Sequence, residues 1–344
     1  MHRLSTNAFK AFSSSSTPSS SSSWRVASLL PSASEILCFI GGQELLVARS
    51  HECNFPPDIS HLPIVTSQTR SEEWTSAKEV DSTVSSMLSS NISLYRIDEN
   101  KIKALQPHLI LTQDICNVCA VDLVTVQHLA QQMHPNSPEI LSLNPQSLGD
   151  VLDDILLVGD RVGLTEEAAQ NRRELENRIQ QARDIADESD FTPNVAFIEW
   201  PDPVYVGGHW TPQLIQMAGG SHPLNQAPSD VTLGAGKSFP IDIQKLVESD
   251  PDFIICAPCG LQLLQSIEEG QLLLKKHEAF RNLRAVKENR FIAVDGDAYF
   301  NRPGIRLVDA LEWLVYVLHK DHHPFALKMC PQGFAHHYID VHDY

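Results

Sequence analysis

Two long helices with no strand between them are predicted in the middle of the chain. Apolar residues recur at helical spacing over Leu148–Val162, and they do so again over Thr165–Glu188. Ser147, followed three residues later by an acidic residue, is typical of a helix start, and Gly163 is typical of a helix end. The second helix would contain roughly 23 residues and span about 35 Å, at about 1.5 Å per residue. That length matches the width of a small domain, so the helix can join two domains.

Short apolar strands alternate with helices on both sides of this pair. Residues 107–116 and 251–259 each hold a proline, then a short apolar strand, and then a polar turn with a cysteine. Strands that alternate with helices indicate mostly parallel sheets. We therefore predict an α/β fold of two lobes with mostly parallel sheets flanked by helices, joined by a long rigid helix, with a ligand cleft between the lobes. The expected boundaries are a leader at 1–24, an N-terminal lobe at 25–146, connecting helices at 147–190, a C-terminal lobe at 191–320 and a tail at 321–344.

The predicted elements of the two lobes include strands and a helix with definite bounds. Strands are expected at Leu109–Thr112 and Phe253–Cys256, and a helix is expected at Arg306–His319. The residues after Asp321 are rich in His and Pro and show no periodicity, so no element is predicted there. The tail histidines could attract a metal, but a histidine cluster without a period is more often solvated.

Charge and cysteine content restrict the class of protein. The net charge of -17 argues against a nucleic-acid partner, and no apolar run has the length of a membrane span. Seven cysteines, an odd number, do not resemble a secreted disulfide framework, so a reducing, cytoplasmic location is expected. The Ser-rich residues 1–24 lack an apolar core typical of a secretory signal. They are interpreted either as a transit peptide for a mitochondrion or plastid, or as a disordered leader.

Several aromatic residues are expected at the carboxyl ends of the strands. Ligands of open parallel sheets bind at these ends. The aromatic residues are Trp74, Trp200, Tyr205, Trp210, Tyr299 and Phe300. A cleft with aromatic faces and few polar groups suits a large, flat, partly apolar ligand. The alternative is that these rings pack between elements, and for any single ring both interpretations stay open.

Cys116 and Cys119 form a C-x-x-C pair between a predicted strand and a predicted helix. A helix N-terminus lowers a thiol pKa, so this pair could bind Zn or Fe, together with Cys53 and His209, or could act in redox chemistry. The pair supports an alternative function, an intracellular enzyme or metal/redox protein on the same scaffold. The competing interpretation is that these cysteines are small buried residues in tight turns.

Two glycine-containing segments do not fit nucleotide motifs. Residues 234–238 resemble a P-loop, but Val231 stands where its first glycine is required. Gly207 and Gly208 lack the spacing of a dinucleotide fingerprint. Neither segment indicates a nucleotide site.

Four segments, in order, resemble a known family. They are residues 25–36, 53–65, 105–111 and 289–309. Together they are similar to the class III, helical-backbone substrate-binding proteins, which are the cobalamin- and iron-siderophore-binding components of ABC importers, and most similar to the cobalamin-binding branch. The resemblance implies a binding protein, rather than an enzyme, for a corrinoid (cobalamin-like) or related metal chelate.

The residues expected on the ligand face come from the turns after the predicted strands. They are Ser32, Ser34, Trp74, Trp200, His209, Trp210 and Phe300. The two serines would donate hydrogen bonds, and the aromatic rings and His209 would line the ligand. A small-molecule ligand is the expected partner. The missing export signal argues against a transporter partner, and a stiff joining helix predicts little domain closure.

Overall fold

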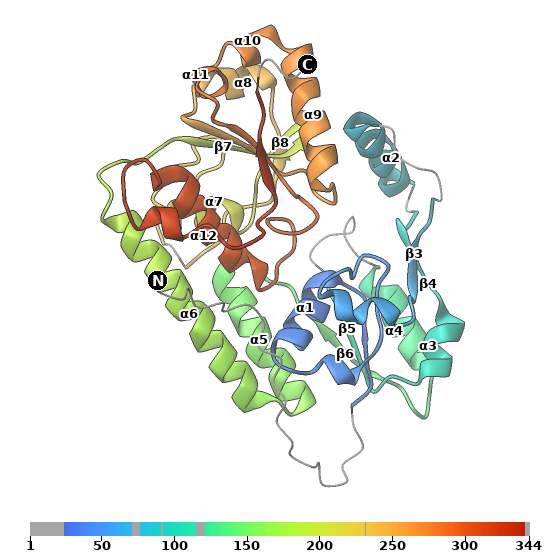
Figure 1. Cartoon of the computed structure of the whole chain (residues 1–344). Helices are drawn as coiled ribbons and strands as arrows, with labels where there is room; N and C mark the ends of the chain where they lie inside the picture. Colours follow the sequence, from blue (N-terminus) through green and yellow to red (C-terminus); the bar gives the residue numbers. More distant parts are fainter. Residues whose placement is uncertain (1–23, 71–75, 91, 115–120, 231, 341–344) are drawn as a thin grey trace.

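The computed structural model describes residues 24–70, 76–90, 92–114, 121–230 and 232–340. Two α/β lobes lie one above the other in Figure 1, and a pair of long helices, α5 and α6, runs along one side of both. This architecture confirms the predicted fold class. Trp74, Cys116 and Cys119 lie outside the described residues. In the described part of the chain, we find no helix with enough length and apolar character to cross a membrane.

The N-terminal lobe is built on a parallel four-stranded sheet in the order β2-β1-β5-β6. Its elements are β1 (Val26–Ser28), α1 (Pro31–Phe39), η1 (Gln43–Leu45), β2 (Leu46–Ala48), η2 (Pro57–His61), α3 (Glu99–Leu105), β5 (Leu109–Thr112), α4 (Leu123–Gln132) and β6 (Glu139–Ser142). β5 is buried on both faces, which explains its unbroken apolar sequence. Leu109 and Leu111 face α1, whereas Ile110 packs with α3 and α4.

A smaller unit projects from this lobe. β3 (Thr66–Gln68) and β4 (Tyr95–Ile97) form an antiparallel pair, and α2 (Ala77–Ser89) lies between them in sequence. In Figure 1, α2 stands away from the N-terminal sheet and beside α9 of the other lobe. Ala77 is the one fully buried residue of this helix, so α2 is attached mainly through its first turn.

The C-terminal lobe is built on a six-stranded mixed sheet in the order β12-β11-β10-β7-β8-β9. The strands β7, β10 and β11 are parallel, and β8, β9 and β12 are added antiparallel at the two edges. Its elements are β7 (Val195–Pro201), β8 (Val204–Val206), α7 (Thr211–Met217), β9 (Phe239–Pro240), α8 (Ile243–Glu248), β10 (Phe253–Cys256), α9 (Leu263–Lys276), α10 (Glu278–Arg281), α11 (Arg284–Lys287), β11 (Phe291–Val294), α12 (Arg306–His319), η3 (Ala326–Lys328) and β12 (His336–Tyr338).

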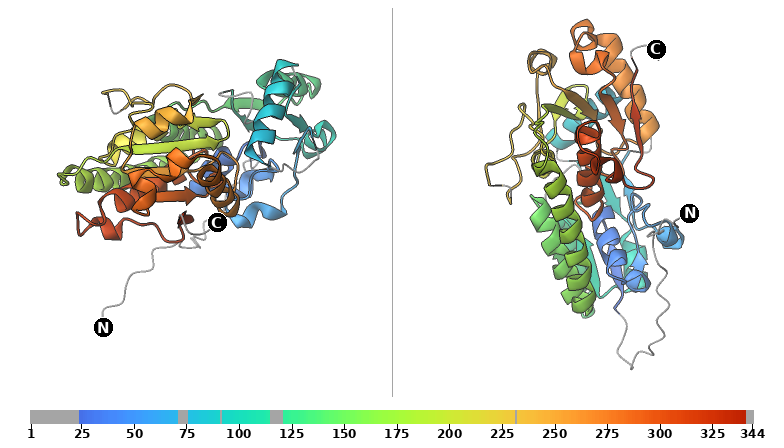
Figure 2. Two further views of the ribbon diagram at one scale, coloured as in Figure 1. Left: turned by 90° about the horizontal axis from the view of Figure 1, so that it is seen from above. Right: turned by 60° about the vertical axis from the view of Figure 1, so that its left-hand side comes forward.

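The helices α5 (Leu148–Val162) and α6 (Thr165–Asp187) carry the chain from one lobe to the other. Ser147 and Asp150 form a reciprocal capping box at the start of α5, as predicted. Gly163 ends α5 with a φ of 78°, a conformation that favours glycine. The two helices pack side by side along the length of the molecule (Figure 2).

One continuous hydrophobic cluster joins the lobes. It includes buried residues of α1 in the N-terminal lobe, α5 and α6, and β7, α7 and α12 in the C-terminal lobe. Arg178 of α6 reinforces this packing by donating to Glu312 of α12 at 2.7 and 2.8 Å. Two separate clusters fill the outer faces of the two sheets. The lobes therefore share a core, in addition to the covalent link through α5 and α6.

The region after residue 321 contains a strand that the sequence analysis did not predict. β12 pairs antiparallel with β11, with His337 opposite Ala293. Ile339 is buried in the C-terminal core. This segment is therefore part of the C-terminal sheet, and the short strand is held by pairing rather than by an apolar pattern of its own.

Candidate functional site

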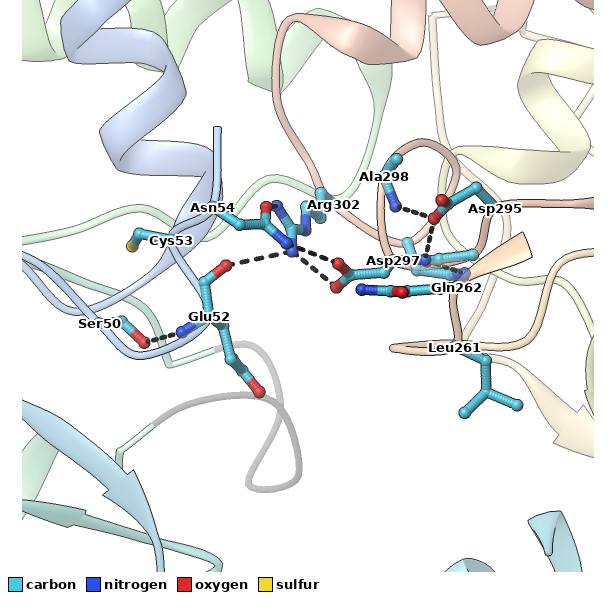
Figure 3. Close-up of polar contacts among 12 residues, drawn as sticks. Ser50, Glu52, Cys53, Asn54, Leu261, Gln262, Asp295, Asp297, Ala298 and Arg302 are labelled. Carbon is cyan, nitrogen blue, oxygen red and sulfur yellow. Dashed lines mark hydrogen bonds and ion pairs between the residues drawn. The ribbon is translucent and has the colours of Figure 1, made fainter. Parts of the chain in front are cut away.

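The turns that follow β2 and β11 face each other between the lobes. We call these turns, residues 50–54 and 295–302, together with Leu261 and Gln262 beside them, the interlobe face (Figure 3). Both β2 and β11 belong to the parallel parts of their sheets, so these turns are at strand carboxyl ends. Ligands of open α/β sheets bind at such ends.

Asn54, Asp297 and Arg302 connect the two lobes through side-chain hydrogen bonds. Asn54 Nδ2 donates to Asp297 Oδ2 at 2.8 Å, and Asn54 Oδ1 accepts from Arg302 at 2.8 Å. Arg302 also donates to Asp297 Oδ1 at 2.6 Å and to the Glu52 carbonyl at 3.2 Å (Figure 3). The guanidinium therefore lies between a carboxylate of its own lobe and two oxygen atoms of the other turn, the Asn54 side-chain oxygen and the Glu52 carbonyl.

A buried ion pair lies behind this contact. Glu35 of α1 has a side chain that is 0 % exposed, and it accepts from Arg306 at 2.6 and 3.0 Å and from Arg302 at 3.4 Å. Arg306 also lies over the Phe55 ring, 4.5 Å from its centroid. The sequence analysis missed these three charged residues as a group. One signal was available, because a glutamate inside an apolar helix needs a cationic partner.

Glu52 is the acidic side chain of the β2 turn that points away from the Asn54–Arg302 contact (Figure 3). Its Oε1 accepts from the Tyr95 hydroxyl at 3.0 Å and lies 4.0 Å from His51 Nε2. Burial raises the pKa of Glu52, and the Tyr95 hydrogen bond and the Arg302 charge oppose that rise. Burial lowers the pKa of His51, so the neutral imidazole is favoured beside this carboxylate.

A second contact between the lobes is made by α2, and we call it the α2 clasp. The Ala77 amide donates to Glu269 Oε1 of α9 at 2.8 Å, and Trp200 Nε1 donates to the Ala77 carbonyl at 3.2 Å. Asp81 accepts a hydrogen bond from Tyr205 of β8. Burial raises the pKa of Asp81, and the nearby charge of Asp202 raises it further. Of the predicted ligand-face residues that the structure describes, Trp200 is the one found at this contact.

The two predicted serines are at the start of α1, but both are buried. Ser34 Oγ lies 3.1 Å from Cys53 Sγ and 3.5 Å from the Leu30 carbonyl. Ser32 lies beside Gly304 of the other lobe. The assignment of these serines to a ligand stays a prediction, because in this structure they pack beneath the interlobe face.

His209, Trp210 and Phe300 lie near the point where the chain enters α5. The His209 ring stacks on Trp210 at 5.5 Å, and its Nδ1 lies 3.2 Å from Gln146 Oε1. Trp210 Nε1 donates to the Phe300 carbonyl at 2.7 Å. The Phe300 side chain is 1 % exposed and packs edge-on against Phe197. The ring of Phe300 is therefore a core group here, and its role toward a ligand remains a prediction.

The thiols of Cys38, Cys53 and Cys256 are not activated. Burial raises the pKa of Cys38 to about 12 and that of Cys53 to about 11, and burial also raises the pKa of Cys256. His209 and Cys53 belong to different parts of the molecule. Within the ranges that the structure describes, no group of three His, Cys, Asp or Glu side chains is arranged to hold a metal ion. The predicted Zn or Fe site at Cys116 and Cys119 falls outside those ranges.

The chain matches one protein family and is similar in fold to several solved structures. The family model described as periplasmic binding protein matches residues 26–298. A search of curated proteins found no match. Among solved structures, the chain is similar to a periplasmic heme-binding protein, RhuT, from Roseiflexus sp. RS-1. The identity is 22 %, the match covers 87 % of this chain and 99 % of that one, and the TM-score is 0.62.

Two further structures have the same fold. The periplasmic vitamin B12 binding protein BtuF of Vibrio cholerae is 19 % identical, with 88 % of this chain and 98 % of that chain covered and a TM-score of 0.60. A possible iron-binding, periplasmic solute-binding protein from Staphylococcus epidermidis is 18 % identical, with 86 % and 98 % covered and a TM-score of 0.62.

These comparisons correct one expectation. The predicted cytoplasmic, mitochondrial or plastid location is wrong, because the matching family and these structures are periplasmic. The inference from the odd cysteine count failed because free cysteines can simply be buried. Cys53 and Cys256 are fully buried here and need no reducing compartment to remain unpaired.

Proposed function

Because the chain belongs to the periplasmic binding protein family, we propose that it binds a small-molecule metal chelate between its two lobes. The observation that carries this proposal is the interlobe face, where the turns after β2 and β11 meet. Structures of this fold are described as binding heme, vitamin B12 or iron. Heme and vitamin B12 are metal complexes with large organic ligands.

A corrinoid is our first candidate within this class. Trp200 supports it, because its indole ring is partly exposed at the edge of the space between the lobes. A tryptophan face can stack on a flat macrocycle. His209 and Trp210 would then contribute to the binding site from the region where the chain crosses between lobes.

Titration with three probes tests the proposal. Cyanocobalamin, hemin and ferrioxamine B would each be added to the full chain, while tryptophan fluorescence and probe absorption are recorded. We expect saturable quenching by at least one probe, with a Kd in the micromolar range or below. If none of the three binds at 100-fold higher concentration than the protein, the proposed function is wrong.

Substitution of Trp200 tests where the chelate binds. Trp200→Ala should weaken binding by about 1–3 kcal/mol, whereas Trp200→Phe should retain most of the affinity through its ring. Trp24→Ala is the matched control, because Trp24 packs near His108 at the opposite end of the N-terminal sheet. Equal losses in the Trp200 and Trp24 variants would place the ligand elsewhere.

A further inference from the structure

Arg302 of the interlobe face and two arginines beside it, Arg306 and Arg49, are paired with groups of the protein itself. Arg302 is 8 % exposed and bonds to Asn54, Asp297, Glu35 and a carbonyl. Arg306 is 11 % exposed and is held by both oxygens of Glu35. At the end of β2, the Arg49 guanidinium donates to three backbone carbonyls. None of these groups is left to receive an anion from the space between the lobes.

The carboxylates around this space are less well compensated. Glu52 points away from the Asn54–Arg302 contact (Figure 3), and its carboxylate accepts from the neutral Tyr95 hydroxyl and lies 4.0 Å from His51, whose neutral form is favoured by burial. At the α2 clasp, Asp81 is hydrogen-bonded to the neutral Tyr205 hydroxyl. The negative charge of Asp202 repels the Asp81 carboxylate. Burial raises the pKa of both Glu52 and Asp81, which is the direction expected for carboxylates without a closely paired cation.

The exposed cation Lys237 lies outside the interlobe face. Lys237 lies on the loop beside Gly208, and its charge contributes to lowering the pKa of His209. His209 contacts Gln146 where the chain enters α5. This lysine therefore belongs to the region of the crossing rather than to the interlobe face.

We propose that the interlobe face selects metal chelates whose peripheral groups are neutral or cationic, and that Glu52 disfavours chelates carrying free carboxylates. This inference rests on the proposed function and specifies the chemistry of its ligand. A carboxylate placed beside Glu52 would be repelled and would find the Arg302 and Arg306 guanidiniums already paired with Asp297 and Glu35, whereas an amide, ester or ammonium group would not be repelled.

A matched pair of porphyrins isolates the effect of charge. Hemin has two carboxylates, and its dimethyl ester has the same macrocycle with none. We expect the wild-type chain to bind the ester at least 10-fold more tightly than hemin at low ionic strength. In Glu52→Gln, which keeps an oxygen that can accept from Tyr95, this ratio should fall at least threefold. Glu44→Gln, an exposed change in the same lobe, should leave the ratio unchanged.

The outcomes separate the two proposals. Hemin binding as tightly as the ester, or a ratio that Glu52→Gln does not alter, would overturn the charge inference and leave the proposed function standing. If neither porphyrin binds and cyanocobalamin and ferrioxamine B also fail to bind, the proposed function is wrong and the charge inference fails with it. Thermal unfolding of Glu52→Gln, with a midpoint close to that of wild type, confirms that the variant is folded.

Discussion

His222 and Asp154 are buried titratable residues whose shifts affect stability in opposite directions. Burial lowers the pKa of His222 to about 4, and among the described residues its Nε2 has no hydrogen-bond partner. Burial raises the pKa of Asp154 to about 7, with further contributions from Asp150 and Asp153. Each shift implies a difference in proton binding between the folded and unfolded chain, so each gives a pH-dependent free energy of unfolding.

For His222, stability should be lost in acid. The folded-state pKa lies below the unfolded value of about 6.5, so the unfolded chain binds the proton first as the pH falls. The stability linked to His222 is complete above pH 6.5 and is lost progressively toward pH 4, by up to about 3 kcal/mol. Urea unfolding of wild type and His222→Asn at pH 7.5 and 4.5 measures this. The advantage of wild type should shrink by about 2–3 kcal/mol at pH 4.5, and a constant difference would contradict the prediction.

For Asp154, stability should be lost in base. The folded-state pKa lies above the unfolded value, so the folded chain holds the proton more tightly, and stability declines as the pH rises from about 4 to 7. Asp154→Asn should therefore be more stable than wild type at pH 8, by about 1–3 kcal/mol, and similar to it at pH 4. Asp160→Asn, an exposed change on the same helix, is the control. Equal effects of both variants would contradict a burial mechanism.

At the scale of elements, α5 and α2 have similar N-caps but very different burial. Ser147 caps α5, which supplies many residues of the shared core, and Ser76 caps α2, in which Ala77 is the fully buried residue. Ser147→Ala should lower the free energy of global unfolding by about 1 kcal/mol, because α5 unfolds only with the core. Ser76→Ala should speed amide exchange within α2 and leave global unfolding nearly unchanged. Equal global effects would show that α2 is more integrated than its burial indicates.

The elements also show which parts of the fold could be predicted from sequence. The helix Arg306–His319 and the strands Leu109–Thr112 and Phe253–Cys256 have the predicted bounds, because each has a strong apolar pattern and a clear boundary. β4 and β12 were missed, since three-residue strands held by pairing carry little local signal. The second long helix begins at Thr165, as predicted, and ends at Asp187, one residue before the predicted end.

The site was less predictable than the fold. Asn54 and Asp297 form a hydrogen bond although they are 243 residues apart in the sequence. Contacts of this kind depend on how the sheets of the two lobes are oriented toward each other. Aromatic residues at strand ends were predicted to line a ligand, but Phe300 is buried in the core. The sequence placed the relevant turns correctly and could not show which side chains of each turn point outward.

At the scale of the whole molecule, the shared core predicts that both lobes unfold together. The cluster running from α1 through α5 and α6 to α12 belongs to neither lobe alone. Calorimetry should therefore show a single thermal unfolding transition. In Glu35→Gln this transition should move to a lower temperature and remain single. The expected loss is about 3 kcal/mol, because Arg306 would keep its charge in a largely buried position. Two resolved transitions in wild type would contradict a shared core.

The same packing limits domain closure. The α5–α6 pair packs on itself and on both lobes, and the contacts of Asn54, Asp297 and Arg302 join the turns of the two lobes. Small-angle scattering should therefore show a change in radius of gyration of less than about 1 Å when a chelate identified by titration is added. A larger compaction would mean that these interlobe contacts open in solution.

The position of β12 near the end of the described chain affects when the C-terminal sheet can be completed during translation. The N-terminal sheet needs only residues up to Ser142, so all of its strands emerge during the first half of synthesis. The C-terminal sheet is finished only when His336–Tyr338 have been translated and can pair beside β11. Before that point, β11 is an unpaired edge strand of the C-terminal sheet in the nascent chain. Such an edge is a site for pairing with other chains, so a nascent chain paused before residue 336 should be more prone to aggregate than the finished one.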